Sequence, residues 1–175
     1  MSDQSGRPSV RVLLCGERMR GDDAAALRAA EMLPEDARAL AEVVEVGQLS
    51  VEALLDIPDG VAAIVADSAV GVAPGVVVTL PLEHVAQGAA GGPGAAGGPG
   101  AAGGATPASS HSLPPDQVLA LAAELRGSLP RGVFVGIGGA EFGFGERLSP
   151  AVAAGLAAYA ATLADEIRRL SADEP

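Results

Sequence analysis

Short apolar runs alternate with segments of helical periodicity along most of this chain. The apolar runs are nearly continuous and end in glycine or acidic residues, which is typical of strands buried on both faces of a parallel sheet. We predict strands at 10–15, 41–46, 61–66 and 132–137, and a further strand or hairpin partner at 76–80. Apolar residues at helical spacing predict helices at 24–33, at 51–55, after Pro115 and after Ser149–Pro150. This alternation indicates an α/β fold, a three-layer α/β/α sandwich around a mostly parallel, twisted sheet.

Polar residues mark the starts of several of these helices. Asp22 and Asp23 precede the first helix, where acidic side chains complement the helix dipole. We interpret Asp22 as an N-cap or first-turn dipole partner. Ser50 is the expected N-cap of the helix at 51–55. Ser149 and Pro150 start the last helix, whose apolar stripe contains Val152, Leu156, Tyr159, Leu163 and Ile167.

One segment has no such pattern. Most of residues 88–107 repeat Gly-Ala-Ala-Gly-Gly-Pro, a composition in which glycine raises the entropic cost of folding, proline removes donors and alanine buries little surface. At 175 residues the chain has the length of one domain. We therefore predict a single domain over residues 1–175, in which 88–107 form a flexible Gly/Ala/Pro-rich loop insertion.

The composition narrows the classes of partner. The formal net charge is -11, so the surface repels phosphate backbones and we expect no nucleic-acid partner. All 11 basic residues are arginine. The amino-terminal residues lack the apolar core of a signal peptide and no apolar segment is long enough to span a bilayer, so we expect no membrane partner and a cytoplasmic protein.

A single cysteine, Cys15, ends the first predicted strand. One cysteine cannot form an internal disulfide, which fits a reducing compartment. Because it closes an apolar strand, we interpret it as a buried and inert thiol.

Polar residues that suit metal chemistry follow the predicted strands. Asp23 comes after the first strand, Asp67 directly after the strand at 61–66, and His111 after the repeat segment. Loops at the carboxyl ends of parallel strands share one edge of the sheet, so these side chains can converge there. Two carboxylates and an imidazole make a divalent-metal site with open coordination positions.

Each of these residues also has an ordinary structural interpretation. Asp23 can be a dipole partner of its helix, and Asp67 can be a simple turn residue at the end of a strand. A histidine in a serine-rich segment, such as His111, is often only solvated or hydrogen-bonded. His84 is expected at the surface. The pattern alone leaves both interpretations open.

The order of several motifs resembles that of the hydrogenase maturation proteases. Residues 16–26 are similar to the opening motif of that family, Gly-Asn-Pro-Leu-Arg-Gly-Asp-Asp/Glu-Gly-x-Gly, and 62–67 to its apolar strand closed by Asp. Ser110-His111 resembles its Ser/Thr/Pro-His signature, and the stretches 136–140 and 144–152 resemble its last strand and its Leu-Ser-Pro-x-Val helix start. The likeness runs from about residue 10 to residue 167.

This resemblance implies a five-stranded sheet with one antiparallel strand and a metal site. It also implies an endopeptidase that removes the C-terminal peptide of a nickel-loaded hydrogenase large-subunit precursor. Carried over, the catalytic and metal-binding residues are Asp23, Asp67 and His111, and the nickel is that of the substrate. The implied partner is the large-subunit precursor, and we expect the protein to be a monomer.

The sequence departs from the family pattern beside these residues. Glu17 and Arg18 replace the motif's Asn and Pro, and alanines at 24 and 26 replace its helix-start glycines. Glu45-Val46-Gly47 stands where Asp-Gly-Gly is common. Losing glycine where backbone approaches a peptide favours a narrower substrate cleft.

Two other classes of function compete with the protease. A signalling receiver also uses acidic residues after its first and third strands, but it needs a lysine after its last strand and this chain has none. The lost glycines favour a catalytically silent homologue that binds a nickel protein or acts in assembly. Binding of a precursor without release of a peptide would select this module over the protease.

Overall fold

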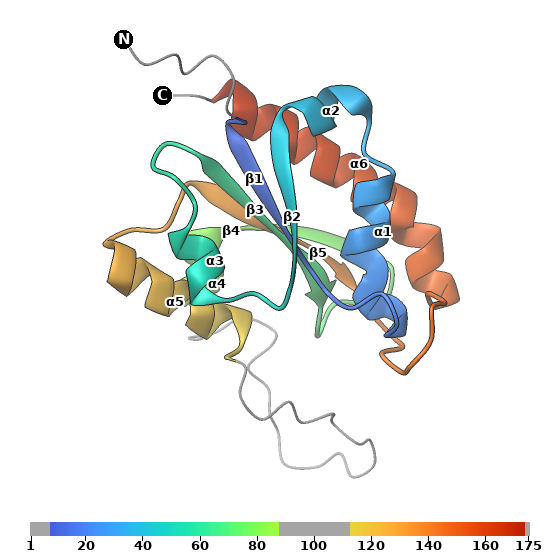
Figure 1. Cartoon of the computed structure of the whole chain (residues 1–175). Helices are drawn as coiled ribbons and strands as arrows, with labels where there is room; N and C mark the ends of the chain where they lie inside the picture. Colours follow the sequence, from blue (N-terminus) through green and yellow to red (C-terminus); the bar gives the residue numbers. More distant parts are fainter. Residues whose placement is uncertain (1–7, 88–112, 174–175) are drawn as a thin grey trace.

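The strands of the part of the chain that the structure describes form one five-stranded sheet (Figure 1). The computed structural model describes residues 8–87 and 113–173. The strand order is β2-β1-β3-β5-β4; among the strands of these described residues, the β4–β5 pair is antiparallel and the other pairs are parallel. The strands are β1 (Val10–Cys15), β2 (Ala41–Gly47), β3 (Ala62–Ala69), β4 (Val77–Pro81) and β5 (Gly132–Gly138).

Helices cover both faces of the sheet and make the three expected layers. One layer contains α1 (Ala25–Glu31), α2 (Glu35–Ala39) and α6 (Pro150–Ala172), and the other contains α3 (Val51–Leu55), α4 (Leu82–Gln87) and α5 (Pro115–Arg126). A 3-10 turn, η1 (Gly21–Ala24), leads into α1. Two separate apolar cores, one under each helical layer, therefore enclose the sheet.

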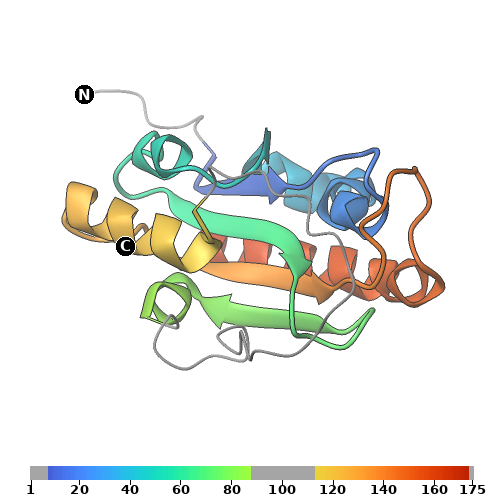
Figure 2. The ribbon, with the colours of Figure 1, turned by 90° about the horizontal axis from the view of Figure 1, so that it is seen from below.

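Alternating side chains of each strand enter opposite cores. In β3, Ile64 and Ala66 lie in the core beneath α1 and α6, whereas Ala63 and Val65 lie in the core beneath α3 and α5. By the same alternation, Asp67 projects toward the α3–α5 layer. Figure 2 shows the arrows of β1, β3 and β5 pointing the same way, so the carboxyl ends of these strands form one edge of the sheet.

The structure confirms the predicted fold class and most predicted elements. Ser50 caps α3, its hydroxyl accepting from the Ala53 amide at 3.2 Å, and Ser149 starts α6. The stripe predicted on α6 is buried except for Leu156, which is half-buried. His84 is exposed, as expected. The pattern missed only the short helices α2 and α4 among the described residues, and both are near the lower limit of helix length.

One boundary was wrong in a way that affects the candidate site. Asp67 does not follow a strand, because β3 continues through Asp67 and Ser68 to Ala69. These residues pair with Gly136, Ile137 and Gly138 of β5. Asp67 is therefore a strand residue whose backbone is fixed by a neighbouring strand, instead of a turn residue.

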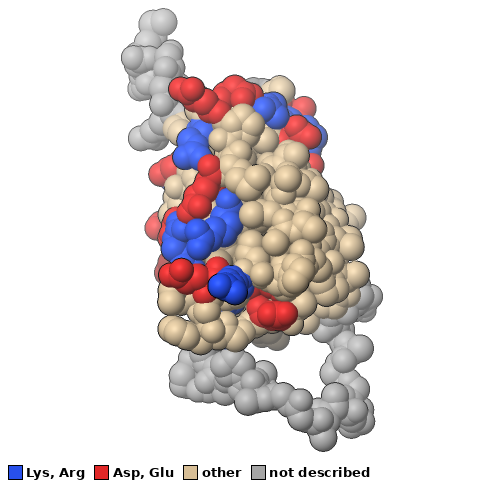
Figure 3. All heavy atoms as spheres, turned by 90° about the vertical axis from the view of Figure 1, so that its right-hand side faces the viewer, with Lys and Arg blue, Asp and Glu red and all other residues tan. Residues whose placement is uncertain are grey.

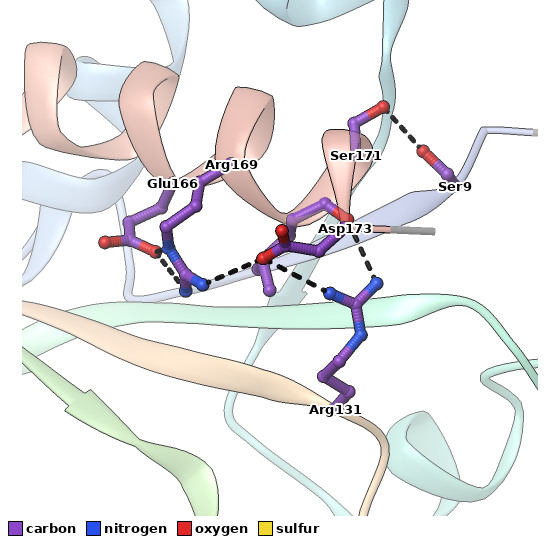
Figure 4. Close-up of polar contacts among 7 residues, drawn as sticks. Ser9, Arg131, Glu166, Arg169, Ser171 and Asp173 are labelled. Atoms are coloured by element: carbon purple, nitrogen blue, oxygen red, sulfur yellow. Dashed lines mark hydrogen bonds and ion pairs between the residues drawn. The ribbon is translucent and has the colours of Figure 1, made fainter. Parts of the chain in front are cut away.

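The opposite edge of the sheet is fastened to the end of α6 (Figure 4). A guanidinium nitrogen of Arg131 donates to the Leu170 carbonyl at 3.0 Å, and the Ser9 hydroxyl donates to that of Ser171 at 2.8 Å. Arg131 also pairs with Asp173 at 3.9 Å. An exposed ion pair contributes only about 0–1 kcal/mol, so the two hydrogen bonds are the firmer part of this contact.

Ion pairs also link the elements of the α1–α6 layer at the surface. Arg168 of α6 lies 2.8 Å from Asp36 of α2 and 3.1 Å from Asp165. In Figure 3, basic side chains lie beside acidic ones along one border, and a broad neutral area covers the rest of that face. The basic side chains on this face therefore lie beside acidic ones. Among residues 8–87 and 113–173, no helix is long and apolar enough to cross a membrane.

Candidate functional site

A cavity opens at the edge where β1 and β3 end, between these strands and the α3–α5 layer. Its volume is about 410 Å³. The two predicted acids, Asp23 and Asp67, line it together with Glu17 and Arg20 of the turn after β1. The remaining lining residues are Gly16, Gly47, Gln48, Leu49, Leu113 and Pro115. The two predicted carboxylates, which are distant in sequence, therefore share one cavity.

Asp23 is held by the turn that follows β1. The Glu17 amide donates to its Oδ2 at 2.9 Å, and Asp23 is half-buried in η1. Burial raises the pKa of Asp23 above its usual value, although the Glu17 amide and the Arg20 guanidinium act in the opposite direction. The carboxylate is thus partly desolvated while one of its oxygens is hydrogen-bonded.

Gly16 makes this turn possible. Its φ is +116°, and a Cβ placed on it would lie 1.8 Å from the Asp23 carbonyl oxygen. Its amide donates to the Gly47 carbonyl at 2.6 Å, where the β1–β2 register shifts. Only a residue without a side chain lets the chain pass so close to the backbone of Asp23.

Asp67 lies deeper than Asp23, within β3. The Ser68 amide donates to its Oδ1 at 2.7 Å. Burial raises the pKa of Asp67 to about 7, and the nearby negative charge of Asp23 adds to this effect. The two acids therefore lie close enough for their charges to interact, although Asp23 comes from η1 and Asp67 from β3.

Tyr159 of α6 fixes the backbone beneath Asp67 from the other face of the sheet. Its hydroxyl is shared between the carbonyl oxygens of Asp67 and Val135, each at 3.0 Å. Tyr159 is fully buried, and burial raises its pKa well above the usual value. One side chain thus ties β3 to β5 at the level of the site.

Cys15 is the buried thiol that the sequence predicted. It is 1% exposed, and burial, followed by the charges of Asp67 and Asp23, raises its pKa. A thiol in this state is a poor nucleophile and a poor metal ligand. Cys15 therefore belongs to the apolar core beneath the α3–α5 layer and not to the lining of the cavity.

The third predicted residue, His111, lies outside the described residues. The chain resumes at Leu113, which lines the same cavity together with Pro115. Within residues 8–87 and 113–173, no group of three or more His, Cys, Asp or Glu side chains could hold a metal ion. The ligand set of Asp23, Asp67 and His111 thus stays a prediction, of which two members line one cavity.

Asp22 lies in the first turn of η1, as predicted, and it also has a role that the sequence did not predict. It does not cap a helix; it is fully buried, and its carboxylate accepts the amides of Ala140, Glu141 and Ser149 at 2.8, 2.8 and 2.6 Å. Burial alone would raise the pKa of Asp22, but these amides outweigh it and lower the pKa. Asp22 therefore holds the loop between β5 and α6 against the turn that carries Asp23.

The departures from the family pattern do not close the cavity. Ala24 and Ala26 are fully buried and neither lines the cavity, so their effect on the width of the cleft stays a prediction. Arg18 pairs with Glu31 at 2.5 Å and with Glu45 at 2.6 Å. Two of the departing residues, Arg18 and Glu45, thus bind one another at the surface.

No pattern in the sequence assigned Arg20 or the Tyr159 hydroxyl to the site. Arg20 lines the cavity, yet its side chain makes no hydrogen bond or ion pair with any other described residue. Its position inside the opening motif was the available signal. The Tyr159 hydroxyl could not have been assigned, because only tertiary structure brings α6 under Asp67.

Comparison with known proteins supports the fold. No family model matches the sequence, and no curated protein matches it. Solved structures do: the hydrogenase maturating endopeptidase HybD from E. coli has a TM-score of 0.65 and 20% identity, covering 91% of this chain and 92% of that one. The [NiFe] hydrogenase maturation protease HybD from Thermococcus kodakarensis has a TM-score of 0.59 and 20% identity, covering 93% and 98%. The HycI protease from the same organism has a TM-score of 0.56 and 22% identity, covering 94% and 95%. The chain therefore has the fold of the hydrogenase maturation endopeptidases.

Proposed function

We propose that this protein is an endopeptidase that removes the C-terminal peptide of a nickel-loaded [NiFe]-hydrogenase large-subunit precursor. The observation that carries the proposal is the pair Asp23 and Asp67, which line one open cavity at the carboxyl edge of the sheet. In open α/β sheets, ligands bind at this edge. Solved structures with the same fold are described as hydrogenase maturation endopeptidases, which supports the substrate class.

The substrate's own nickel is the ion that this cavity would grip. Asp23 and Asp67 supply carboxylate oxygens, and His111 would supply an imidazole from the segment just before Leu113. Imidazole suits nickel well, and carboxylates complete a mixed nitrogen and oxygen set. The ion would then fix the scissile bond beside it, where it can polarise a carbonyl or activate water. In this mechanism the protein recognises a metal that arrives with its substrate.

Arg20 supplies the positive charge that the acids lack. Its guanidinium lines the same cavity and is not paired with any described carboxylate within 4.0 Å. Positive charge beside a peptide carbonyl stabilises the negative charge that develops on its oxygen during hydrolysis. We therefore assign Arg20 to the carbonyl oxygen of the scissile peptide, and the two acids to the metal.

The test is mass spectrometry of a large-subunit precursor before and after incubation with the protein, with and without nickel. We expect loss of a C-terminal peptide only from the nickel-loaded precursor. Asp23→Asn, Asp67→Asn and His111→Ala should abolish this loss, and Asp56→Asn, at an exposed site distant from the cavity, should not.

Two results would contradict the proposal. If Asp67→Asn and His111→Ala process the precursor at the parental rate, the three residues do not form the site. If the parental protein binds the nickel-loaded precursor but releases no peptide, it is a binding module and not a protease.

A further inference from the structure

The loop between β5 and α6 exposes the aromatic residues that the core does not use. The chain has three Phe and one Tyr, and no Trp. Phe134 and Tyr159 are buried. Phe142 and Phe144 both lie in this single loop, and Phe144 is 88% exposed. A chain that uses so few aromatic residues therefore displays two of them at one place.

The same loop borders a second cavity. Its volume is about 480 Å³, and it is lined by Gly21, Glu141 and residues 143–147. Gly21 precedes Asp23 by two residues, so this cavity and the one that holds the acid pair share the turn after β1. Figure 2 shows the orange loop beside the blue one, beyond the arrowheads of β1 and β5.

Backbone contacts hold this loop in place. The Gly21 amide donates to the Gly145 carbonyl at 2.8 Å, and the Gly145 amide donates to the Met19 carbonyl at 2.8 Å. The Asp22 carboxylate fastens Ala140, Glu141 and Ser149 as described above. The ring of Phe142 covers Gly139, where a Cβ would lie 2.4 Å from it. A loop fixed in this way loses little conformational entropy when a partner binds.

We propose that the loop 139–148 is a docking surface for the precursor protein, separate from the cavity that holds the scissile bond. This inference rests on the proposed function for the identity of the partner. Exposed aromatic side chains in a rigid setting are typical of the residues that dominate binding energy at protein interfaces. Continuity with the acid pair through the turn at residues 19–23 places the surface beside the substrate's cleavage site.

The charge of the surface indicates the chemistry of the matching region. Glu141 and Glu146 line the cavity with a single basic residue, Arg147, and the whole chain carries a net charge of -11. The complementary region of the precursor is therefore an apolar side chain flanked by Lys or Arg.

The experiment measures binding and cleavage separately. Affinity of the nickel-loaded precursor for the immobilised protein is compared for the parent, for Phe144→Ala and for Leu125→Ala. Leu125 is the matched control, because it is 63% exposed and lies next to Arg126, which binds Asp59 before β3 at the opposite edge of the sheet. We expect Phe144→Ala to weaken binding and to raise KM at least about tenfold with kcat unchanged, and Leu125→Ala to change neither.

The outcomes distinguish the two proposals. If the parent cleaves the precursor and Phe144→Ala binds it with parental affinity, the docking surface is wrong and the protease stands. If the parent binds the precursor through Phe144 without cleaving it, the docking surface stands and the protease is wrong. A parent that does not bind the precursor overturns the docking surface outright.

Discussion

At the scale of single residues, Asp22 and Asp23 show how neighbours in sequence can differ in role. Asp22 is fully buried and accepts three amides, whereas Asp23 is half-buried and accepts one. In the sequence, the two residues are simply adjacent acids before a helix. Their roles differ only in the folded protein, because the loop between β5 and α6 supplies the amides that donate to Asp22.

Substitution of these neighbours should separate stability from activity. Removing a buried, fully hydrogen-bonded carboxylate leaves its donors unpaired, so Asp22→Ala should lower the free energy of unfolding by about 3–5 kcal/mol. Asp23→Asn should change it by about 1 kcal/mol or less while abolishing processing. Urea titrations with the processing assay measure both effects. Equal losses of stability in the two variants would show that Asp22 is not a structural anchor.

The raised pKa of Asp67 predicts a dependence of stability on pH. The pKa is about 7 in the folded protein against an ordinary value of 3.8, so the folded state binds this proton more tightly than the unfolded chain does. Ionising Asp67 therefore costs stability, and this cost grows from about pH 4 to pH 7 and stays constant above it. It amounts to roughly 4 kcal/mol if the whole shift acts on unfolding.

Asp67→Asn removes this cost because the amide does not ionise. The free energy of unfolding of the variant should rise relative to that of the parent as the pH increases from 4 to 8, in chelator and urea. A constant difference between Asp67→Asn and the parent would contradict the shift.

At the scale of elements, the sequence predicts strands better than it predicts where they end. Val10–Cys15 was placed correctly because buried apolar runs have a strong signal. The extension of β3 through Asp67 could not be read locally, because Asp and Ser are poor strand residues and only pairing with Gly136–Gly138 keeps them extended. Tertiary pairing outweighed local propensity at one of the two acids that line the cavity.

Two glycines with positive φ provide a test of the turn after β1. Gly16→Ala should lower the free energy of unfolding by about 3 kcal/mol or more for two reasons. The new Cβ clashes with the Asp23 carbonyl oxygen, and alanine is strained at this positive φ. Gly60 has φ of +83° but nothing within 4 Å of a built Cβ, so Gly60→Ala should cost only about 1–2 kcal/mol. Thermal or urea unfolding compares them. Similar losses of stability in the two variants would mean that the turn after β1 can shift to accommodate the new Cβ.

At the scale of the whole molecule, topology is what brings the site together. The sequence was sufficient to predict that loops at one edge of a parallel sheet converge, and Asp23 and Asp67 do share a cavity. It was not sufficient to assign Arg20, because only the three-dimensional arrangement of the described residues shows that its guanidinium lines this cavity. The position of His111 and its role as a ligand both stay predictions, since this residue lies outside the described residues.

The prediction of one domain can be tested by shortening the repeat segment. Helices α4 and α5, which flank it in the sequence, share one apolar core through Leu82, Val118 and Leu119. Deleting residues 90–105 while keeping His111 should therefore change the free energy of unfolding by about 1 kcal/mol or less, because closure entropy depends only weakly on length. Circular dichroism during urea unfolding measures it. A loss of the cooperative transition would show that the segment belongs to the core.

The carboxylate of Asp22 has a consequence for how the molecule opens. Opening the loop between β5 and α6 would leave a buried negative charge and three amides without hydrogen-bond partners. These three hydrogen bonds should therefore break together and not one by one. The amide protons of Ala140, Glu141 and Ser149 should exchange with deuterium together, and as slowly as those of β1, despite lying outside any strand or helix. In the parent protein the loop amides would then exchange as slowly as those of the sheet that the loop borders. In Asp22→Ala the same amides would exchange as fast as those of exposed loops.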